Sequence, residues 1–300
     1  MQPSPVIRRT ELTCPAHSLK MMAKAAASAA DEVILDLEDA CAVSQKVAAR
    51  QTLIEALRTL DFGSKVVAIR PNGIHTSYHY RDLIEVVEAA GQQIQVVVLP
   101  KVERADDVLF VDRLLTQIEQ HCGLEVGRIR LEVLIESARA VLDAERIAAC
   151  SPRMASLIFG LADYAGDIGA RSADDQWSAF HYPKHKMLIA ARAAGIDAID
   201  NVTFAFRDAE QCRRDAERAA QLGFDGKWVI HPSQIPIVNA AFLPTAPELE
   251  RAQRIISAYE RADAEAGLGA IVVDDEMIDA ASLRVEAKKL AVARRAGMIV

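Results

Sequence analysis

The chain has 300 residues, of which 51% are hydrophobic and 26% are charged, and its formal net charge is −7. This length and apolar content suffice for one large domain with a buried core, and the acidic balance argues against a nucleic-acid partner, which requires a clustered basic face. The N-terminus lacks the apolar stretch of a signal peptide, no run reaches the ~20 apolar residues of a membrane span, and the five cysteines form no C-x-x-C pair. We therefore expect a cytoplasmic protein with reduced thiols and no membrane partner.

Short runs rich in Val, Ile and Leu recur along the chain, and a helix-like stretch follows each of them. Between the runs, apolar residues recur at three- and four-residue spacing, as at Val108, Val111 and Leu115, which predicts helices with one buried face. In chain order the runs predict eight strands, at residues 8–13, 33–38, 65–70, 95–100, 129–136, 155–162, 197–203 and 226–231.

Eight strand–helix units favour a closed (β/α)₈ barrel, because closure leaves no exposed sheet edge. An open, doubly wound parallel sheet is the alternative. It is disfavoured because no G-x-G-x-x-G motif follows the first strands and no G-x-x-x-x-G-K-[ST] motif occurs.

The segment beyond the eighth strand is too long to be one barrel helix. Its pattern predicts a helix over 247–265, a turn and a short strand pair in AGLGAIVVDDEMID, and a helix over 280–296. We divide the chain into a catalytic barrel domain, residues 1–245, and a C-terminal extension, residues 246–300, which packs on the barrel or on a neighbouring subunit.

Charged or polar residues end many of the predicted strands. In a parallel barrel the C-terminal strand ends lie on one face, so residues distant in sequence converge there and form an enzyme pocket. The residues at these ends are Glu38, Asp39, Arg70, Lys101, Glu136, Asp163 and His231.

Glu136 and Asp163 follow two consecutive strands, so their carboxylates are expected to be neighbours. Two such carboxylates repel each other unless a positive charge neutralises them, and Mg²⁺ needs only one or two protein carboxylates. The pair therefore predicts a magnesium site. The alternative is that each carboxylate caps the helix that follows it.

Arg70 offers a planar, two-pronged donor to a substrate carboxylate or to a developing enolate oxygen. The alternative is an internal ion pair with Glu38 or Asp39, and both interpretations can hold together. Lys101 is either a Schiff-base lysine or an ion-pairing group near the site, and the second is favoured because nothing in the sequence signals a lowered pKa.

Two further residues have local explanations. His231 is either a base or metal ligand, or a structural hydrogen-bonding residue beside Pro232. Asp279 directly precedes a helix-forming run, and this position is typical of an N-cap.

The motifs RRTELTCP, AADEVILDLEDA, VAIRPNG, VVLPKVE, IESA, GLADYAGDIG, GFDGKWVIHPSQI and MIDAAS follow one another along the chain. In this order, over residues 7–296, the chain resembles the citrate lyase β-subunit-like CoA-ester lyases of the HpcH/HpaI aldolase superfamily, which include malyl-CoA and citramalyl-CoA lyases. The resemblance implies a (β/α)₈ barrel with a C-terminal lid, assembled as a homotrimer or hexamer. It also implies an Mg²⁺-dependent lyase that breaks or forms a carbon–carbon bond between a short acyl-CoA and an α-keto acid.

The same resemblance assigns roles to residues at the strand ends. Glu136 and Asp163 match the Mg²⁺ ligands, and Arg70 matches the arginine that binds the keto acid and stabilises the thioester enolate. Metal and arginine would then both stabilise the charge that appears on the enolate.

Four more residues match family positions. Asp279 matches an acid/base on the lid, which reaches a neighbouring subunit's site, and the hinge of this lid would be Gly267-Leu268-Gly269. Glu38 and Asp39 match acids that order metal-bound water and the arginine, and Lys24 matches a basic position near the CoA phosphates.

Three other functions compete with a CoA-ester lyase. A citrate lyase β subunit would act on a citryl-carrier-protein thioester, and a class II pyruvate aldolase would act without CoA. A non-catalytic scaffold is disfavoured because Arg70, Glu136, Asp163 and Asp279 are all present.

Overall fold

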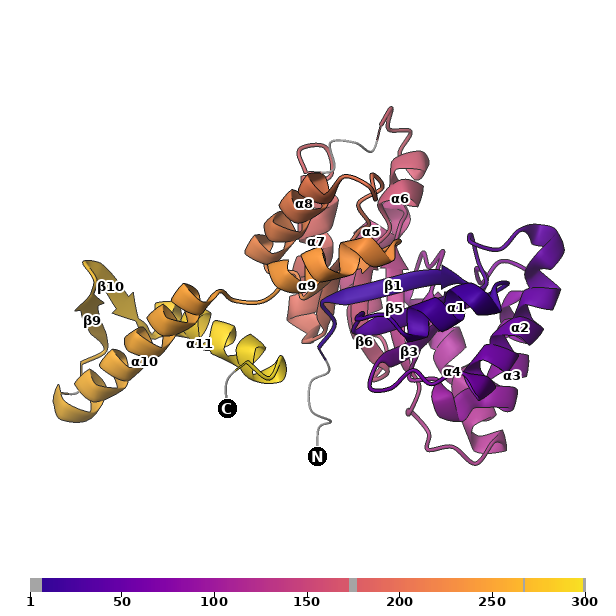
Figure 1. Cartoon of the computed structure of the whole chain (residues 1–300), viewed down its shortest axis with the longest axis horizontal. Helices are drawn as coiled ribbons and strands as arrows, with labels where there is room; N and C mark the ends of the chain where they lie inside the picture. Colours follow the sequence, from indigo (N-terminus) through magenta and orange to yellow (C-terminus); the bar gives the residue numbers. More distant parts are fainter. Residues whose placement is uncertain (1–6, 173–176, 267, 299–300) are drawn as a thin grey trace. The chain divides into compact units, whose positions relative to one another are not determined.

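The computed structural model describes residues 7–172, 177–266 and 268–298 (Figure 1). The chain divides into two compact units, one from Arg8 to Asn239 and one that combines the residues before Arg8 with those from Ala240 onward. Among the described residues, no helix is both long enough and apolar enough to cross a membrane. All five cysteines are free thiols.

The first unit is a closed barrel of eight parallel strands joined in chain order, which confirms the predicted (β/α)₈ fold and its eight strands. β8 closes the barrel by pairing with β1, where Thr10 lies opposite Lys227 and Leu12 opposite Val229. The strands are β1 Thr10–Pro15, β2 Glu32–Asp36, β3 Val66–Arg70, β4 Val96–Leu99, β5 Arg130–Ile135, β6 Met154–Phe159, β7 Asp197–Asp200 and β8 Gly226–Val229.

Helices connect the strands on the outside of the barrel (Figure 1). In α4 the predicted apolar face is buried through Val108, Val111 and Leu115, and Asp107 accepts backbone hydrogen bonds at the start of the helix. The barrel helices are α1 Leu19–Ala26, α2 Lys46–Thr59, α3 His79–Ala90, α4 Ala105–His121, α5 Ala138–Ala149, α6 Leu161–Asp167, α7 His181–Ala194 and α8 Ala209–Leu222.

Side chains that alternate along the strands fill the middle of the barrel with an apolar layer. Its members are Ile34, Val66, Ala68, Val96, Val98, Leu134, Ile158, Ile199 and Trp228. The seam between β8 and β1 depends on Gly226, because a Cβ at this position would lie 1.7 Å from the carbonyl oxygen of Arg8. Only glycine allows the two backbones to approach this closely.

The second unit contains the predicted helix, strand pair and helix. α10 (Ala246–Ala266) and α11 (Ala280–Arg295) share a small core of Leu249, Ala252, Leu290 and Ala293. β9 (Ala270–Val273) and β10 (Glu276–Asp279) form an antiparallel hairpin whose two turn residues, Asp274 and Asp275, have positive φ. The boundary between Asn239 and Ala240 falls within α9 (Ile235–Ala241), so only the last two residues of this helix belong to the second unit. The predicted boundary at residue 245 and the lid role of the extension remain predictions, and Gly267 of the predicted hinge lies outside the described residues.

Candidate active site

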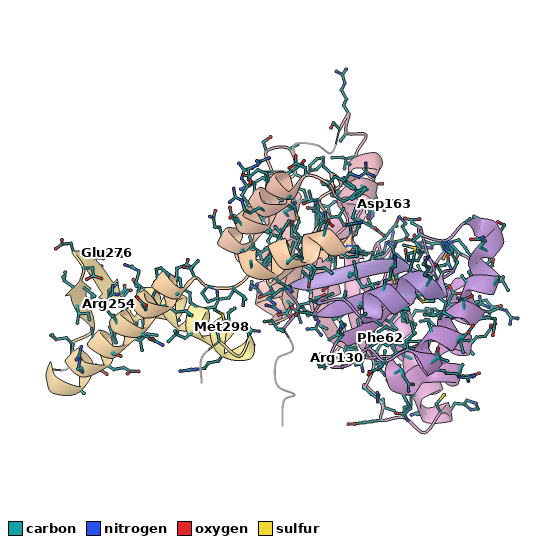
Figure 2. The ribbon with its side chains drawn as sticks, viewed as in Figure 1. Phe62, Arg130, Asp163, Arg254, Glu276 and Met298 are labelled. Atoms are coloured by element: carbon teal, nitrogen blue, oxygen red, sulfur yellow. The ribbon has the colours of Figure 1, made fainter. Side chains whose placement is uncertain are left out.

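The C-terminal ends of β2 to β6 carry a group of charged side chains, which we call the rim cluster: Asp36, Glu38, Arg70, Lys101, Glu136 and Asp163. Arg70 is the last residue of β3, Glu136 directly follows β5, and Asp163 lies in the first turn of α6. Figure 2 labels Asp163 at this end of the barrel and Arg130, the first residue of β5, near the other end. The structure thus brings together six of the seven strand-end residues that the sequence predicts to converge, whereas the seventh, His231, is not part of this cluster.

The guanidinium of Arg70 is held in place by acids from the neighbouring strand. Its Nε and Nη2 donate to the two carboxylate oxygens of Asp36 at 2.7 and 2.6 Å, and its Nη1 lies 3.1 Å from Glu38 Oε2. The indole ring of Trp228 lies 5.2 Å from the guanidinium carbon. This planar group therefore has a defined orientation at the inner edge of the rim.

Asp36 is a residue of this site that the sequence reasoning missed. The expected partners of Arg70 were Glu38 and Asp39, but Asp39 instead lies 3.7 Å from Lys101, with its side chain 63% exposed. Strand alternation was the available signal, because Asp36 lies two residues from both Ile34 and Glu38 and so shares their inward face. In the β2–β3 register Asp36 stands directly opposite Arg70.

Lys101 places an ammonium group among the acids of the rim. Its Nζ lies 2.6 Å from Asp163 Oδ1, 3.7 Å from Glu38 Oε1 and 3.8 Å from Glu136 Oε1. Burial alone would lower the pKa of Lys101, but the charge of Glu136 and the hydrogen bond to Asp163 outweigh burial and raise it. This charged lysine fits the ion-pairing interpretation better than a Schiff-base nucleophile, which requires a neutral amine.

Glu136 is buried and oriented by its surroundings. Its Oε1 accepts a hydrogen bond of 2.5 Å from the backbone N–H of Lys101, which has a left-handed φ of 56°. Burial raises the pKa of Glu136 to about 8, although the positive charge of Lys101 opposes this rise. Gly160 makes the position possible, because a Cβ there would lie 2.4 Å from the Cβ of Glu136.

The rim cluster fits a hard divalent cation. Glu136 and Asp163 supply carboxylate oxygens just beyond the ends of two adjacent strands, and both already lie beside one cationic group, the ammonium of Lys101. Oxygen ligands of this kind suit Mg²⁺. The two residues are thus able to hold the metal that the resemblance implies, and their assignment as its ligands remains a prediction.

Asp279 is the N-cap of α11, as its local sequence predicts. Its Oδ1 accepts hydrogen bonds from the backbone N–H groups of Ala281 and Ser282, both at 2.9 Å, and from the Ser282 hydroxyl at 3.0 Å. These hydrogen bonds, led by those from Ser282, lower the pKa of Asp279. The residue belongs to the second unit, and its catalytic role remains a prediction. The same holds for Lys24, an exposed residue in the last turn of α1.

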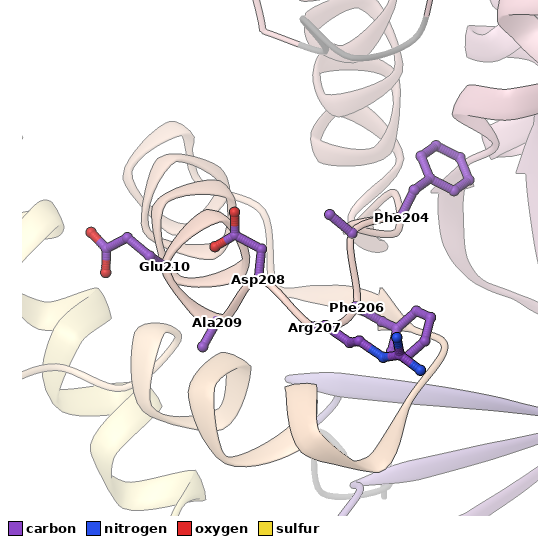
Figure 3. A pocket seen from close by; sticks show the side chains of 7 residues that line it. Phe204, Phe206, Arg207, Asp208, Ala209 and Glu210 are labelled. Carbon is purple, nitrogen blue, oxygen red and sulfur yellow. The ribbon is translucent and has the colours of Figure 1, made fainter.

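His231 has the structural hydrogen-bonding role that its sequence context suggests. Its Nδ1 lies 2.8 Å from the Ser233 hydroxyl and accepts a hydrogen bond from the Ser233 backbone N–H. Its ring packs against Phe206, with ring centroids 5.0 Å apart. Phe206 belongs to the β7–α8 loop. Residues 204–210, from this loop and the start of α8, line an open cavity of about 710 Å³ (Figure 3).

Comparison with known proteins finds relatives of this chain among described enzymes. The family model for HpcH/HpaI aldolase/citrate lyase matches residues 9–232. The L-malyl-CoA/beta-methylmalyl-CoA lyase of Rhodobacter capsulatus is 38% identical over 299 residues, covering 94% of this chain and 93% of that protein. The citrate lyase subunit beta of Leuconostoc mesenteroides subsp. cremoris is 37% identical, covering 91% and 89%. The crystal structure of CitE from Mycobacterium tuberculosis, in complex with magnesium, acetoacetate and coenzyme A, aligns with a TM-score of 0.79 at 32% identity, covering 97% and 98%.

Proposed function

This chain belongs to the HpcH/HpaI aldolase/citrate lyase family, and from that membership we propose that it is an Mg²⁺-dependent carbon–carbon lyase of 3-hydroxyacyl-CoA esters. Its substrates would be malyl-CoA, citramalyl-CoA or a relative, and its products an acyl-CoA and an α-keto acid. The observation that carries the proposal is the convergence of Arg70, Glu136 and Asp163 at one end of the barrel, beside the cationic Lys101.

The rim cluster is suited to the charge that develops in such a reaction. In cleavage, a base removes the proton of the 3-hydroxyl group and the carbon–carbon bond breaks. The electron pair of that bond moves onto the thioester as an enolate, which then takes up a proton at carbon. Mg²⁺ held by Glu136 and Asp163 would supply Lewis-acid stabilisation to the keto-acid oxygens.

Arg70 would bind the keto acid and stabilise the enolate oxygen. Asp36 and Glu38 fix the plane of its guanidinium before substrate arrives, and a preoriented donor needs little reorganisation during the reaction. Asp39 would assist in ordering water near the metal. Lys24 would contact the CoA phosphates.

Asp279 would serve as the acid/base, brought by the C-terminal extension to the site of a neighbouring subunit. The protein would form a homotrimer or a hexamer, and it would be located in the cytoplasm. A lid of this kind excludes water and completes the site only when substrate is bound.

A screen of acyl donors and acceptors tests the proposal. Acetyl-CoA and propionyl-CoA are combined with glyoxylate, pyruvate or oxaloacetate in the presence of Mg²⁺, and the 3-hydroxyacyl-CoA products are identified by mass spectrometry. We expect at least one pair to react, and the same ester to be cleaved in the reverse assay.

The citrate lyase subunit beta of Leuconostoc mesenteroides, at 37% identity, makes the carrier-protein thioester the second candidate substrate. Turnover of a citryl-carrier-protein thioester without turnover of free CoA esters would favour that function. If neither the carrier-protein thioester nor any free CoA ester is turned over, both proposed functions are wrong.

A further inference from the structure

Three fully buried glutamates meet at the N-terminal end of the barrel, at the opposite ends of the strands from the rim cluster. We call them the basal cluster: Glu11 on β1, Glu32 on β2 and Glu132 on β5. Each is 0% exposed, and one carboxylate oxygen from each lies within 4.8 Å of those from the other two. The rim reaction makes no use of these residues, because the apolar layer through Ile34 and Leu134 separates them from Arg70.

The negative charge of the basal cluster exceeds the positive charge beside it. The guanidinium Nε of Arg8 lies 3.2 Å from Glu32 and 3.0 Å from Glu132, and its Nη1 lies 3.1 Å from Asp197. Glu32, Glu132 and Asp197 therefore share one guanidinium, and Glu11 is a fourth carboxylate nearby. Burying carboxylates without matching positive charge is costly, so the cluster requires further neutralisation.

Glu11 points to a ligand most directly. Its side chain is completely buried and directed into the cluster, and neither of its carboxylate oxygens has a hydrogen-bond partner. Burial, followed by the charges of Glu132 and Glu32, raises the pKa of Glu11 well above its usual range. A proton neutralises one carboxylate and lets it donate one hydrogen bond to a neighbouring oxygen. A cation can contact oxygens from all three glutamates at once.

We propose that the basal cluster binds a divalent cation that takes oxygen ligands, such as Ca²⁺, at a site separate from the rim. Ca²⁺ prefers oxygen ligands at about 2.3–2.6 Å, so ligand oxygens up to about 5 Å apart can share one ion. Ser156, opposite Glu132 in the β5–β6 register, places another buried oxygen on the same inward face. The ion would join β1, β2 and β5 and stabilise the closed barrel.

Calcium titration of the full chain tests this site independently of the proposed reaction. Asp163→Ala first disables the predicted rim metal site, and Ca²⁺ binding is then measured by isothermal titration calorimetry. We expect this chain to bind one Ca²⁺ and to unfold at a higher temperature with Ca²⁺ than with a chelator. Adding Glu11→Gln, which keeps the shape of the side chain, should weaken Ca²⁺ binding at least tenfold and abolish the shift in unfolding temperature. Adding Glu55→Gln instead, on the exposed face of α2, should change neither the Ca²⁺ affinity nor the shift in unfolding temperature.

Two results would overturn the proposal. One is the absence of Ca²⁺ or Mn²⁺ binding and of any thermal shift at millimolar ion concentration. The other is Ca²⁺ binding that Glu11→Gln leaves intact. If no ion binds and the chain loses stability as pH rises, and no longer does so after Glu11→Gln, the cluster holds a proton instead of a cation. If Glu11→Gln does not fold, the test is the unfolding temperature of the Asp163→Ala chain, compared between Ca²⁺ and a chelator.

Discussion

Asp36 and Arg70 stand opposite each other at the ends of two adjacent strands, and the carboxylate of Asp36 accepts two hydrogen bonds from the guanidinium of Arg70. A fork-to-fork pair fixes the plane of a guanidinium as well as its position. The internal ion pair and the proposed substrate-binding role are therefore compatible, because the acid orients the arginine for its function.

Arg70→Lys should lower kcat/KM strongly, although it keeps the charge. A lysine cannot reproduce the planar fork, and losing a comparable oriented donor costs about 2–4 kcal/mol of transition-state stabilisation. The measurement is kcat/KM with saturating Mg²⁺. Arg81→Lys, on the exposed side of α3, is the matched control and should retain full activity. Near wild-type activity of Arg70→Lys would mean that Arg70 serves only as an ion-pair partner.

Asp163→Ala should abolish Mg²⁺-dependent turnover while leaving the barrel folded. The Asp163 side chain is 42% exposed at the rim, so its removal opens no cavity in the core. Turnover is measured against Mg²⁺ concentration, together with the unfolding temperature. The unaltered enzyme, stripped by a chelator and then resupplied with Mg²⁺, is the control. Full activity in the chelator would refute the metal site.

Gly160→Ala should disturb the active site through Glu136. The added Cβ would lie 2.4 Å from the Glu136 Cβ and 2.9 Å from its Oε2, so the side chain has to move. Such overpacking costs about 1–3 kcal/mol of folding free energy, and it should also weaken Mg²⁺ binding. Gly166→Ala is the matched control in α6, because nothing lies within 4 Å of its added Cβ. It should stabilise the helix slightly and leave Mg²⁺ binding unchanged. Equal effects of the two substitutions would contradict this prediction.

Asp279→Asn separates helix capping from catalysis. Asparagine caps a helix about as well as aspartate but cannot take up a proton, so the variant should fold normally and lose turnover. Mixed oligomers of Asp279→Asn and Asp163→Ala, formed under verified subunit exchange, should regain part of the activity if the site is shared. Unimpaired Asp279→Asn would end the catalytic role. If the mixed oligomers regain no activity, Asp279 acts only on the barrel of its own subunit.

Lys184 should give the stability of the protein a pH dependence above pH 8. This fully buried lysine donates to Asp200 at 2.7 Å, and burial lowers its pKa from 10.5 to about 8 despite that partner. Between these two values the unfolded chain holds more protons on Lys184 than the folded chain does. The contribution of Lys184 to the free energy of unfolding therefore increases as pH rises through this window.

Denaturant unfolding of the unaltered chain and of Lys184→Met, from pH 7.5 to 10.5, measures this contribution. The free energy of unfolding of the unaltered chain, minus that of Lys184→Met, should rise with pH. Lys20→Met, at an exposed position of α1, should show no such rise. A flat difference for Lys184→Met would show that Lys184 titrates alike in both states.

The barrel and most of its rim were predictable because they depend on repeated local patterns. Arg70 and Glu136 mark strand ends, and the parallel topology brings such ends together. Asp36 was missed because it lies inside an apolar run, VILDLED, where only the alternation of faces reveals its direction. Asp279 differs again, since its cap is a local feature but its catalytic role depends on where the extension docks. Docking depends on tertiary and subunit contacts that no local pattern encodes.

The alternation of charge along two strands also bears on how faithfully the barrel must assemble. On β2 the inward residues are Glu32, Ile34 and Asp36, and on β5 Glu132 and Leu134 are followed by Glu136 just beyond the strand end. A slip of one residue turns a strand's side chains to the opposite face. A shift of β2 or β5 by one residue would thus bury two carboxylates in the apolar layer under the helices. It would also separate these carboxylates from their partners at the rim and in the basal cluster. A register error in β2 or β5 therefore costs more free energy than the same error in a uniformly aliphatic strand. These two strands thus favour the correct register of the sheet.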